Sequence, residues 1–221
     1  MDSLSPLVEI LKPLYISFIG IAFIVSLISF KWNFPFHLKF FSVLLGLTFL
    51  VELVGVYGLK QFNLGNYRNG LYNCFMLVEF SAYAYFFRQI LTKWKLIPTI
   101  ILIALPICWL ISNLMTKDIN KWNSLFVVIG ASCTIFMVVT YYAELLTSTE
   151  PVRLLRQPEF IIATAMLIFY TCTLPYLGPL NYLNERHIIS SKAFLSVLRI
   201  LNIIMYSLFS YAFICQRTIG K

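Results

Sequence analysis

The chain has 221 residues, of which 60% are hydrophobic and only 12% are charged, and its net charge is +8. A soluble domain usually carries about 25% charged residues, so the composition excludes a soluble globular protein and predicts an all-α, polytopic membrane protein. Lys and Arg are spread over the short segments between apolar stretches, where lipid headgroups attract them. The sequence contains no run of basic residues, so we do not predict nucleic-acid binding.

Seven apolar stretches each approach the roughly 20 residues that a helix needs to cross a bilayer. In chain order, the predicted spans cover about Leu14–Phe30, Phe40–Leu59, Leu71–Ile90, Ile97–Met115, Ser124–Leu146, Glu159–Pro179 and Ala193–Cys215. They occupy most of the chain, and no segment between them is long enough to fold alone. We therefore predict one integral membrane domain over residues 1–221, built as a seven-transmembrane-helix bundle.

The orientation follows from the basic residues at the span ends. Seven spans place the termini on opposite sides of the membrane, and slightly more Lys and Arg residues lie on the side of the C-terminus. By the positive-inside rule, we expect the N-terminus outside and the C-terminus in the cytoplasm. The cell (inner) membrane is the expected location.

Four ionisable side chains lie inside the predicted spans: Glu52, Glu79, Glu144 and Arg199. Each costs several kcal/mol if it faces lipid, so each should face the bundle interior, a partner or water. At 1.5 Å per residue, Glu52, Glu79 and Arg199 lie in one half of the membrane, within about 5 Å of each other in depth. Glu144 lies near the end of the fifth span, where we expect it to pair with a basic loop residue.

Further polar side chains belong to the same half of the membrane. They are Tyr57, Tyr72, Asn73, Tyr170, Tyr176 and Asn202. We predict that they and the three charged side chains line a polar cavity, open toward the N-terminal side, that binds a small ligand or a proton. The alternative is purely structural: Arg199 neutralises one carboxylate, and burial keeps the other carboxylate protonated.

The third and seventh spans share a weak similarity. When Asn73 is aligned with Asn202, Met76 falls opposite Met205 without a gap. The pattern is compatible with two parallel three-helix units joined by the fourth helix, an arrangement that often places a binding site between the units. The matched residue types are common in such helices, so chance explains the similarity equally well.

Enzymatic motifs are missing from the sequence. The two histidines, His37 and His187, are predicted in loops, and no metal-ligand spacing, nucleophile elbow or phosphate-binding loop occurs. We therefore predict no enzymatic activity and no cofactor or metal. The five cysteines all fall inside predicted helices, so we expect them to be unpaired.

Two functions from different classes fit these observations. The first is a non-enzymatic sensor or signalling subunit, which lacks a soluble output domain and would act through a partner protein or as a homo-oligomer. The second is a small-solute transporter with the same cavity; the 9 glycines and few prolines inside spans count against it, because carriers use such breaks as hinges. A third candidate is a structural subunit of a membrane assembly, whose charges serve packing alone.

Overall fold

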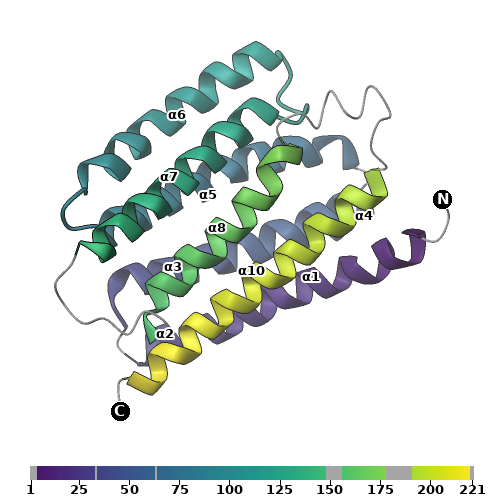
Figure 1. Cartoon of the computed structure of the whole chain (residues 1–221). Coiled ribbons are helices and arrows are strands. Elements are labelled where there is room, and N and C mark those ends of the chain that lie inside the picture. The colour runs from purple at the N-terminus through teal and green to yellow at the C-terminus, as the bar shows by residue number, and fades with distance from the viewer. Residues whose placement is uncertain (1–3, 33, 63, 148–155, 178–190, 220–221) are drawn as a thin grey trace.

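A computed structural model describes residues 4–32, 34–62, 64–147, 156–177 and 191–219, and all regular structure in these ranges is helical (Figure 1). The long helices are α1 (Leu4–Ser26), α3 (Phe36–Leu53), α5 (Arg68–Ile90), α6 (Leu96–Thr116), α7 (Ser124–Leu146), α8 (Pro158–Leu177) and α10 (Ser191–Ile219). The short elements are α2 (Ile28–Lys31), the π-helix η1 (Val54–Gly58), α4 (Leu59–Gln61) and the 3-10 helix η2 (Gly65–Tyr67).

Six helical segments in the described ranges are long and apolar enough to cross a membrane: Glu9–Lys31, Phe36–Gly58, Leu96–Thr116, Ser124–Leu146, Pro158–Pro175 and Leu195–Cys215. The prediction of an integral membrane protein is thereby supported, but the prediction of seven spans is confirmed only in part. The segment predicted as the third span forms helix α5, which does not reach the apolarity of the other six. The reason is that α5 packs against α3, α6 and α7, so polar residues such as Asn73 and Glu79 meet protein rather than lipid.

The helix ends differ from the predicted ends. Helix α1 begins at Leu4 rather than Leu14, and α10 continues to Ile219. Hydropathy marks only the apolar part of a helix, whereas backbone hydrogen bonding continues into its polar first and last turns. The predicted end of the sixth span, Pro179, lies outside the described residues.

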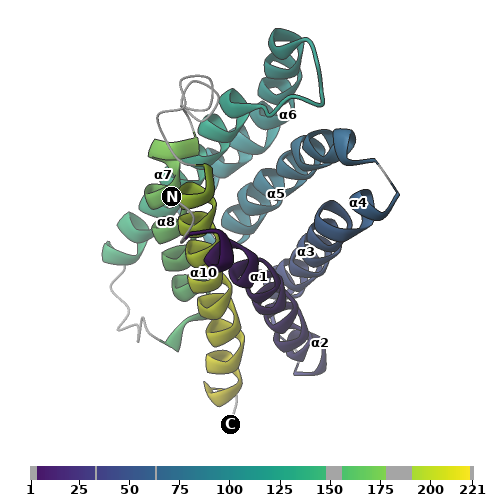
Figure 2. The ribbon, with the colours of Figure 1, turned by 90° about the vertical axis from the view of Figure 1, so that its right-hand side faces the viewer.

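Six of the long helices form a ring in the order α1, α3, α5, α7, α8 and α10, and α10 packs back against α1 (Figure 1, Figure 2). Helix α6 lies outside the ring against α5 and α7. We call the end where α1, α5, α7 and α10 begin the N-terminal end, and the end where α3, α6 and α8 begin the opposite end. This order is compatible with two three-helix units, α1–α3–α5 and α7–α8–α10, joined by α6. That the two units arose as a repeat stays a prediction.

Large aromatic side chains fill the middle of the ring. We call this group the aromatic floor; it consists of Phe41, Phe86, Phe87, Phe209 and Phe213, all at most 1% exposed. The ring centroid of Phe41 lies 5.3 Å from that of Phe86 and 5.1 Å from that of Phe209. In a membrane such van der Waals packing, rather than the hydrophobic effect, holds helices together. The floor therefore ties α3, α5 and α10 to each other below the polar residues.

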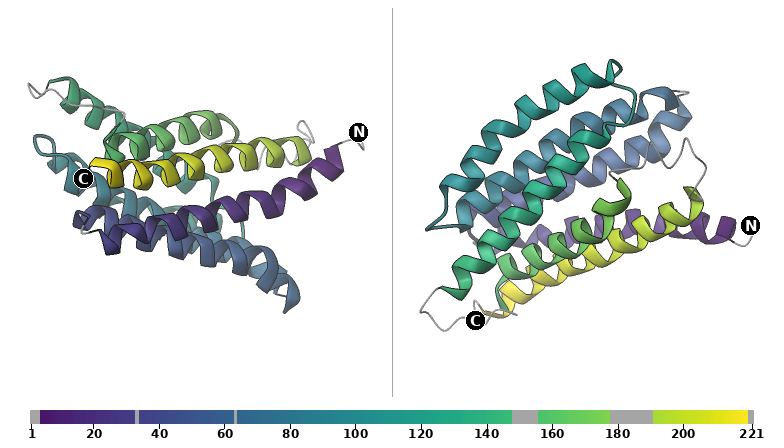
Figure 3. Two further views of the ribbon diagram at one scale, coloured as in Figure 1. Left: turned by 90° about the horizontal axis from the view of Figure 1, so that it is seen from below. Right: turned by 45° about the horizontal axis from the view of Figure 1, so that its top comes forward.

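The helices separate toward the N-terminal end. Helices α1 and α3 lie close together near α2 and diverge toward the start of α1 (Figure 3, left). The polar side chains that come from several helices of the ring meet at this end. The candidate functional site lies there.

Candidate functional site

Glu52 lies in the last turn of α3 and joins three helices. Its Oε2 atom accepts a hydrogen bond of 2.9 Å from the Tyr15 hydroxyl of α1 and one of 3.0 Å from the Tyr72 hydroxyl of α5. A fourth helix contributes Arg199 of α10, whose guanidinium carbon lies 5.9 Å from the centroid of the Tyr15 ring and which interacts electrostatically with Glu52. Such charge-assisted hydrogen bonds are stronger than neutral ones, so Glu52 is firmly held.

Glu79 lies on α5 and has a different set of neighbours. Its Oε1 atom accepts a hydrogen bond of 2.7 Å from the hydroxyl of Tyr83, one helical turn further along α5. Tyr170 of α8 and Tyr206 of α10 interact electrostatically with Glu79, and so does Glu52. The two carboxylates therefore belong to one electrostatic unit, and residues of five helices surround it.

We call this unit the polar centre and define it by eight side chains and one glycine. They are Tyr15, Glu52, Tyr72, Glu79, Tyr83, Tyr170, Arg199 and Tyr206, with Gly55 as the close backbone contact described below.

Burial within the polar centre increases toward the aromatic floor. Glu52, Tyr72, Glu79 and Arg199 are half-buried, whereas Tyr83 is only 2% exposed. The Tyr83 ring packs against Phe41 of the floor at a centroid distance of 6.4 Å. The charged side chains thus retain partial exposure, and Tyr83 links Glu79 to the aromatic floor.

A π-helix begins two residues after Glu52 and shapes the polar centre. At Gly55, in this element, a Cβ atom would lie only 2.7 Å from the Tyr72 hydroxyl oxygen. Glycine is needed here because any side chain would push Tyr72 away from Glu52. Single π-helical turns are rare and often occur at functional sites, since they displace the helix register by one residue.

The opposite end of the ring is held by different interactions. His37 in the first turn of α3 and Glu159 in the first turn of α8 approach to 2.7 Å, between Nε2 and Oε1. The His37 ring also packs edge-on against Phe86 of the aromatic floor. The contact joins two helices that are not neighbours in the ring, so it closes this end across its middle.

Glu144 also lies at the opposite end, as predicted, but its partners differ from the prediction. Its carboxylate accepts hydrogen bonds from the backbone N–H groups of Thr92, Lys93 and Trp94 and from the Thr92 hydroxyl. We expected a basic side chain. The loop before α6 instead presents its unpaired backbone donors, which a carboxylate satisfies at a helix start.

Three predicted site residues lie away from the polar centre. The Asn73 side chain is buried between α5 and the segment after α6, where its Nδ2 atom donates to the carbonyl oxygens of Ile119 and Lys121. Asn202 is half-buried and donates to the Leu198 carbonyl of its own helix. Tyr57 is 48% exposed, and the Lys12 ammonium group lies over its ring.

The other predicted residues fall into two groups. Glu52, Tyr72, Glu79 and Arg199 come together in the polar centre, with Tyr170 at its edge. Tyr176 belongs to α8, but its side chain lies outside the described residues.

Three tyrosines of the polar centre were missed by the sequence analysis: Tyr15, Tyr83 and Tyr206. Tyr83 could have been found, because it is four residues after Glu79 and such pairs meet on one helix face. Tyr15 and Tyr206 carry no comparable signal, since tyrosine is common in this chain and is typical of membrane interfaces as well.

The chemistry available to the polar centre follows from its side chains. Within the part of the chain that the structure describes, no three His, Cys, Asp or Glu residues group closely enough to hold a metal ion. A phenolic hydroxyl can both donate and accept a hydrogen bond, whereas a carboxylate only accepts. Tyrosine therefore keeps a hydrogen bond to a glutamate in either protonation state.

Comparisons with protein-family models, with curated proteins and with solved structures found no match.

Proposed function

We propose that the chain is a non-enzymatic membrane sensor or signalling subunit that binds a proton or a small cationic ligand in the polar centre. The observation that carries the proposal is the accessible carboxylate pair above a closed aromatic floor. Glu52 and Glu79 are half-buried and interact with each other, while Phe41 and Phe86 below them are fully buried. We infer that a ligand would reach the carboxylates from the N-terminal end, because the buried aromatic floor lies on their other side.

The charge balance supports a cationic ligand. Among the described residues, Arg199 is the cation that interacts with Glu52, and Glu79 interacts with tyrosines and with Glu52. Two carboxylates and one guanidinium in a membrane interior leave an excess negative charge, which a proton or a small cation would neutralise. The tyrosine hydroxyl groups would keep their hydrogen bonds through that change.

Binding in the polar centre would reach several helices at once. Tyr15, Tyr72, Arg199 and Tyr206 connect the carboxylates to α1, α5 and α10. A change of charge at Glu79 would therefore alter contacts around the ring. We propose that α5 spans the membrane as the seventh helix, with the N-terminus outside the cell membrane and the C-terminus in the cytoplasm, and that a partner protein or a second copy relays the change.

The first test detects the ligand. Native mass spectrometry of the protein in mild detergent should show a retained small molecule that Glu79→Gln loses and Glu144→Gln keeps. For a proton, infrared difference spectra between acidic and neutral pH should contain a carboxylic-acid band that is absent only from Glu79→Gln. Absence of both signals would overturn the proposal and favour a structural subunit.

A transporter is the second candidate, and the His37–Glu159 contact favours it. This pair closes the opposite end across the ring and could open as an inner gate. Proteoliposomes that contain the purified chain alone should then take up the ligand found by mass spectrometry. Uptake abolished by Glu79→Gln would support the transporter, whereas binding without uptake would support the sensor.

A further inference from the structure

An apolar groove lies on the outside of the bundle at its N-terminal end. It runs between the π-helix and α4 on one side and the start of α5 and the segment after α6 on the other, and its volume is about 420 Å³. The residues that line it are Val54, Leu59, Tyr67, Gly70, Leu71, Cys74, Ile119 and Asn120. Apart from Asn120 and the tyrosine hydroxyl group, these side chains offer no strong hydrogen-bonding group, so an occupant would be apolar where it contacts the groove.

The groove sits where membrane spans end. The span Phe36–Gly58 ends beside it, and the span Leu96–Thr116 ends shortly before Ile119. Tyr57 and Tyr67 are exposed at this level, as tyrosines are at the boundary between acyl chains and headgroups. The groove therefore meets the lipid phase rather than bulk water.

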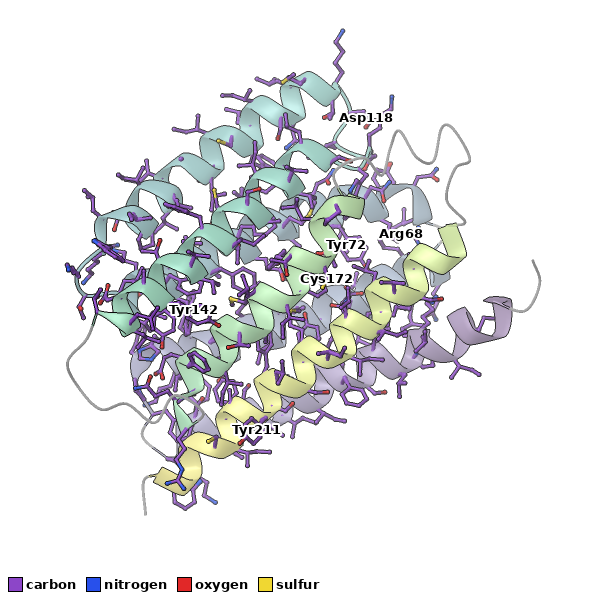
Figure 4. All side chains as sticks on the ribbon, viewed as in Figure 1. Arg68, Tyr72, Asp118, Tyr142, Cys172 and Tyr211 are labelled. Carbon is purple, nitrogen blue, oxygen red and sulfur yellow. The ribbon has the colours of Figure 1, made fainter. Side chains whose placement is uncertain are left out.

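Basic side chains flank the groove. Arg68 follows the lining residue Tyr67, and Lys117 and Lys121 stand on either side of the lining residues Ile119 and Asn120; all three cations are exposed. Asp118 lies at the same end as Arg68 (Figure 4), and its carboxylate accepts a hydrogen bond from the backbone N–H of Asn120. Three cations against one carboxylate attract an anionic headgroup, each cation contributing about 1 kcal/mol near a charged lipid surface.

We propose that this groove is a binding site for one anionic phospholipid, whose acyl chain fills the groove and whose phosphate group contacts Arg68, Lys117 and Lys121. An acyl chain suits the apolar lining, and an anionic headgroup suits the flanking charges. The lipid site stands whether or not the polar centre binds a ligand.

The bound lipid would stabilise the wall of the polar centre. Val54 opens the π-helix that contains Gly55, which contacts the Tyr72 hydroxyl. Leu71, on the other wall of the groove, directly precedes Tyr72 in α5. A lipid between these walls holds the two elements at the distance that lets Tyr72 donate to Glu52. Loss of the lipid should therefore loosen this contact before it affects the opposite end.

Cys74 provides a native probe for the groove, and Cys172 is its matched control. Both thiols are exposed, but only Cys74 lines the groove, while Cys172 lies on α8. We would reconstitute the whole chain into nanodiscs of phosphatidylcholine, with or without phosphatidylglycerol, and follow alkylation by a membrane-permeant maleimide. Phosphatidylglycerol should slow labelling of Cys74 by at least about fivefold and leave the labelling rate of Cys172 unchanged.

Charge variants test the headgroup contact. The double variant Lys117→Gln/Lys121→Gln should abolish the protection of Cys74 by phosphatidylglycerol. The control variant Lys31→Gln/Lys95→Gln changes two exposed lysines at the opposite end and should keep the protection. Equal labelling of Cys74 in both lipid mixtures, or equal protection in both variants, would overturn the proposal.

A filled groove gives an independent readout. Cys74→Trp places a large ring in the groove, whereas Cys172→Trp adds the same ring elsewhere on the lipid-facing surface. Native mass spectrometry after exchange into detergent with phosphatidylglycerol should show one retained lipid in the unaltered chain and in Cys172→Trp, and none in Cys74→Trp. Retention by Cys74→Trp equal to that of the unaltered chain would exclude the groove as the site.

Discussion

The carboxylates at the two ends of the bundle have different kinds of partners. At the opposite end, Glu144 accepts hydrogen bonds from three backbone N–H groups, and Glu159 contacts His37 of another helix. At the N-terminal end, Glu52 and Glu79 accept hydrogen bonds from tyrosines, and they interact with each other. At the opposite end each carboxylate has partners of its own, while the N-terminal end places two carboxylates where their charges oppose each other.

The difference shows how the hydrogen-bond donors around a carboxylate determine whether it can change its charge. Backbone N–H groups can only donate, so they lose their partner when a carboxylate is protonated on the facing oxygen. Tyrosine hydroxyl groups can reverse the hydrogen bond and remain paired. A carboxylate among tyrosines can therefore change its charge without leaving a polar group unpaired, which a sensor requires.

The largest effect is expected from removing the carboxylate that joins three helices. Glu52→Ala deprives Tyr15 and Tyr72 of their shared acceptor and removes a negative charge near Arg199. The variant should lose about 3–5 kcal/mol of unfolding free energy, because two hydrogen bonds to a charged group, each worth about 1.5–3 kcal/mol, are lost together. The measurement is SDS titration of the detergent-solubilised protein followed by circular dichroism.

Glu144→Ala is the control for this prediction at the opposite end. It removes an exposed acceptor of backbone hydrogen bonds and should cost about 1–2 kcal/mol. If Glu144→Ala is the more destabilising of the two, the polar centre is not the firmer junction between helices.

A smaller effect is expected from the π-helix. Gly55→Ala places a methyl group against the Tyr72 hydroxyl and should cost about 1–3 kcal/mol, as other over-packed sites do. Gly58→Ala in the same element finds its nearest atom, a Val54 methyl carbon, at 3.7 Å and should change stability by less than about 0.5 kcal/mol. Thermal unfolding of both variants checks the contrast, and equal melting temperatures would show that Tyr72 has room to move.

Two tyrosines allow the ends to be compared with one chemical change. Tyr83→Phe removes the donor to Glu79 and should cost about 1.5–3 kcal/mol, because the hydrogen bond involves a charged group. Tyr142→Phe removes a hydroxyl that bonds to the Thr164 hydroxyl at the opposite end and should cost about 0.5–1.5 kcal/mol. SDS titration again gives both values, and a larger loss in Tyr142→Phe would contradict the comparison.

The smallest effect is expected at the cross-ring contact of the opposite end. The side chains of His37 and Glu159 are 17% and 19% exposed, so solvent weakens their attraction. A double-mutant cycle with His37→Phe and Glu159→Gln should give a coupling energy of about 0.5–1 kcal/mol. A coupling larger than that of Glu52 with Tyr72 would mean that the opposite end, rather than the polar centre, holds the ring together.

Depth along the helix could be predicted from the sequence, but direction around the helix could not. Hydropathy and the 1.5 Å rise placed Glu52, Glu79 and Arg199 at one level, and the structure brings them into one electrostatic unit. Tyr72 and Asn73 were predicted together because they are adjacent. Adjacent residues point about 100° apart on a helix, so Tyr72 meets Glu52 while Asn73 meets the segment after α6.

The partners of each charge also depend on contacts between distant helices. Tyr15 precedes Glu52 by 37 residues, and nothing in the local pattern around either residue indicates the other. The polar residues of α5 also show that contacts between helices cannot be predicted from a local sequence pattern. Its residues resemble a soluble segment because neighbouring helices cover them, and this coverage is a property of the bundle rather than of the segment.

The closure of the ring by α10 against α1 has a consequence for biosynthesis. A ribosome delivers α1 and α3 to the membrane first, whereas Arg199 arrives with the last helix. Until then the carboxylate of Glu52 lacks the guanidinium that interacts with it in the finished protein. A chain interrupted before α10 would therefore hold the Glu52 carboxylate only by its hydrogen bonds from Tyr15 and Tyr72, so the last helix completes the electrostatic balance of the polar centre.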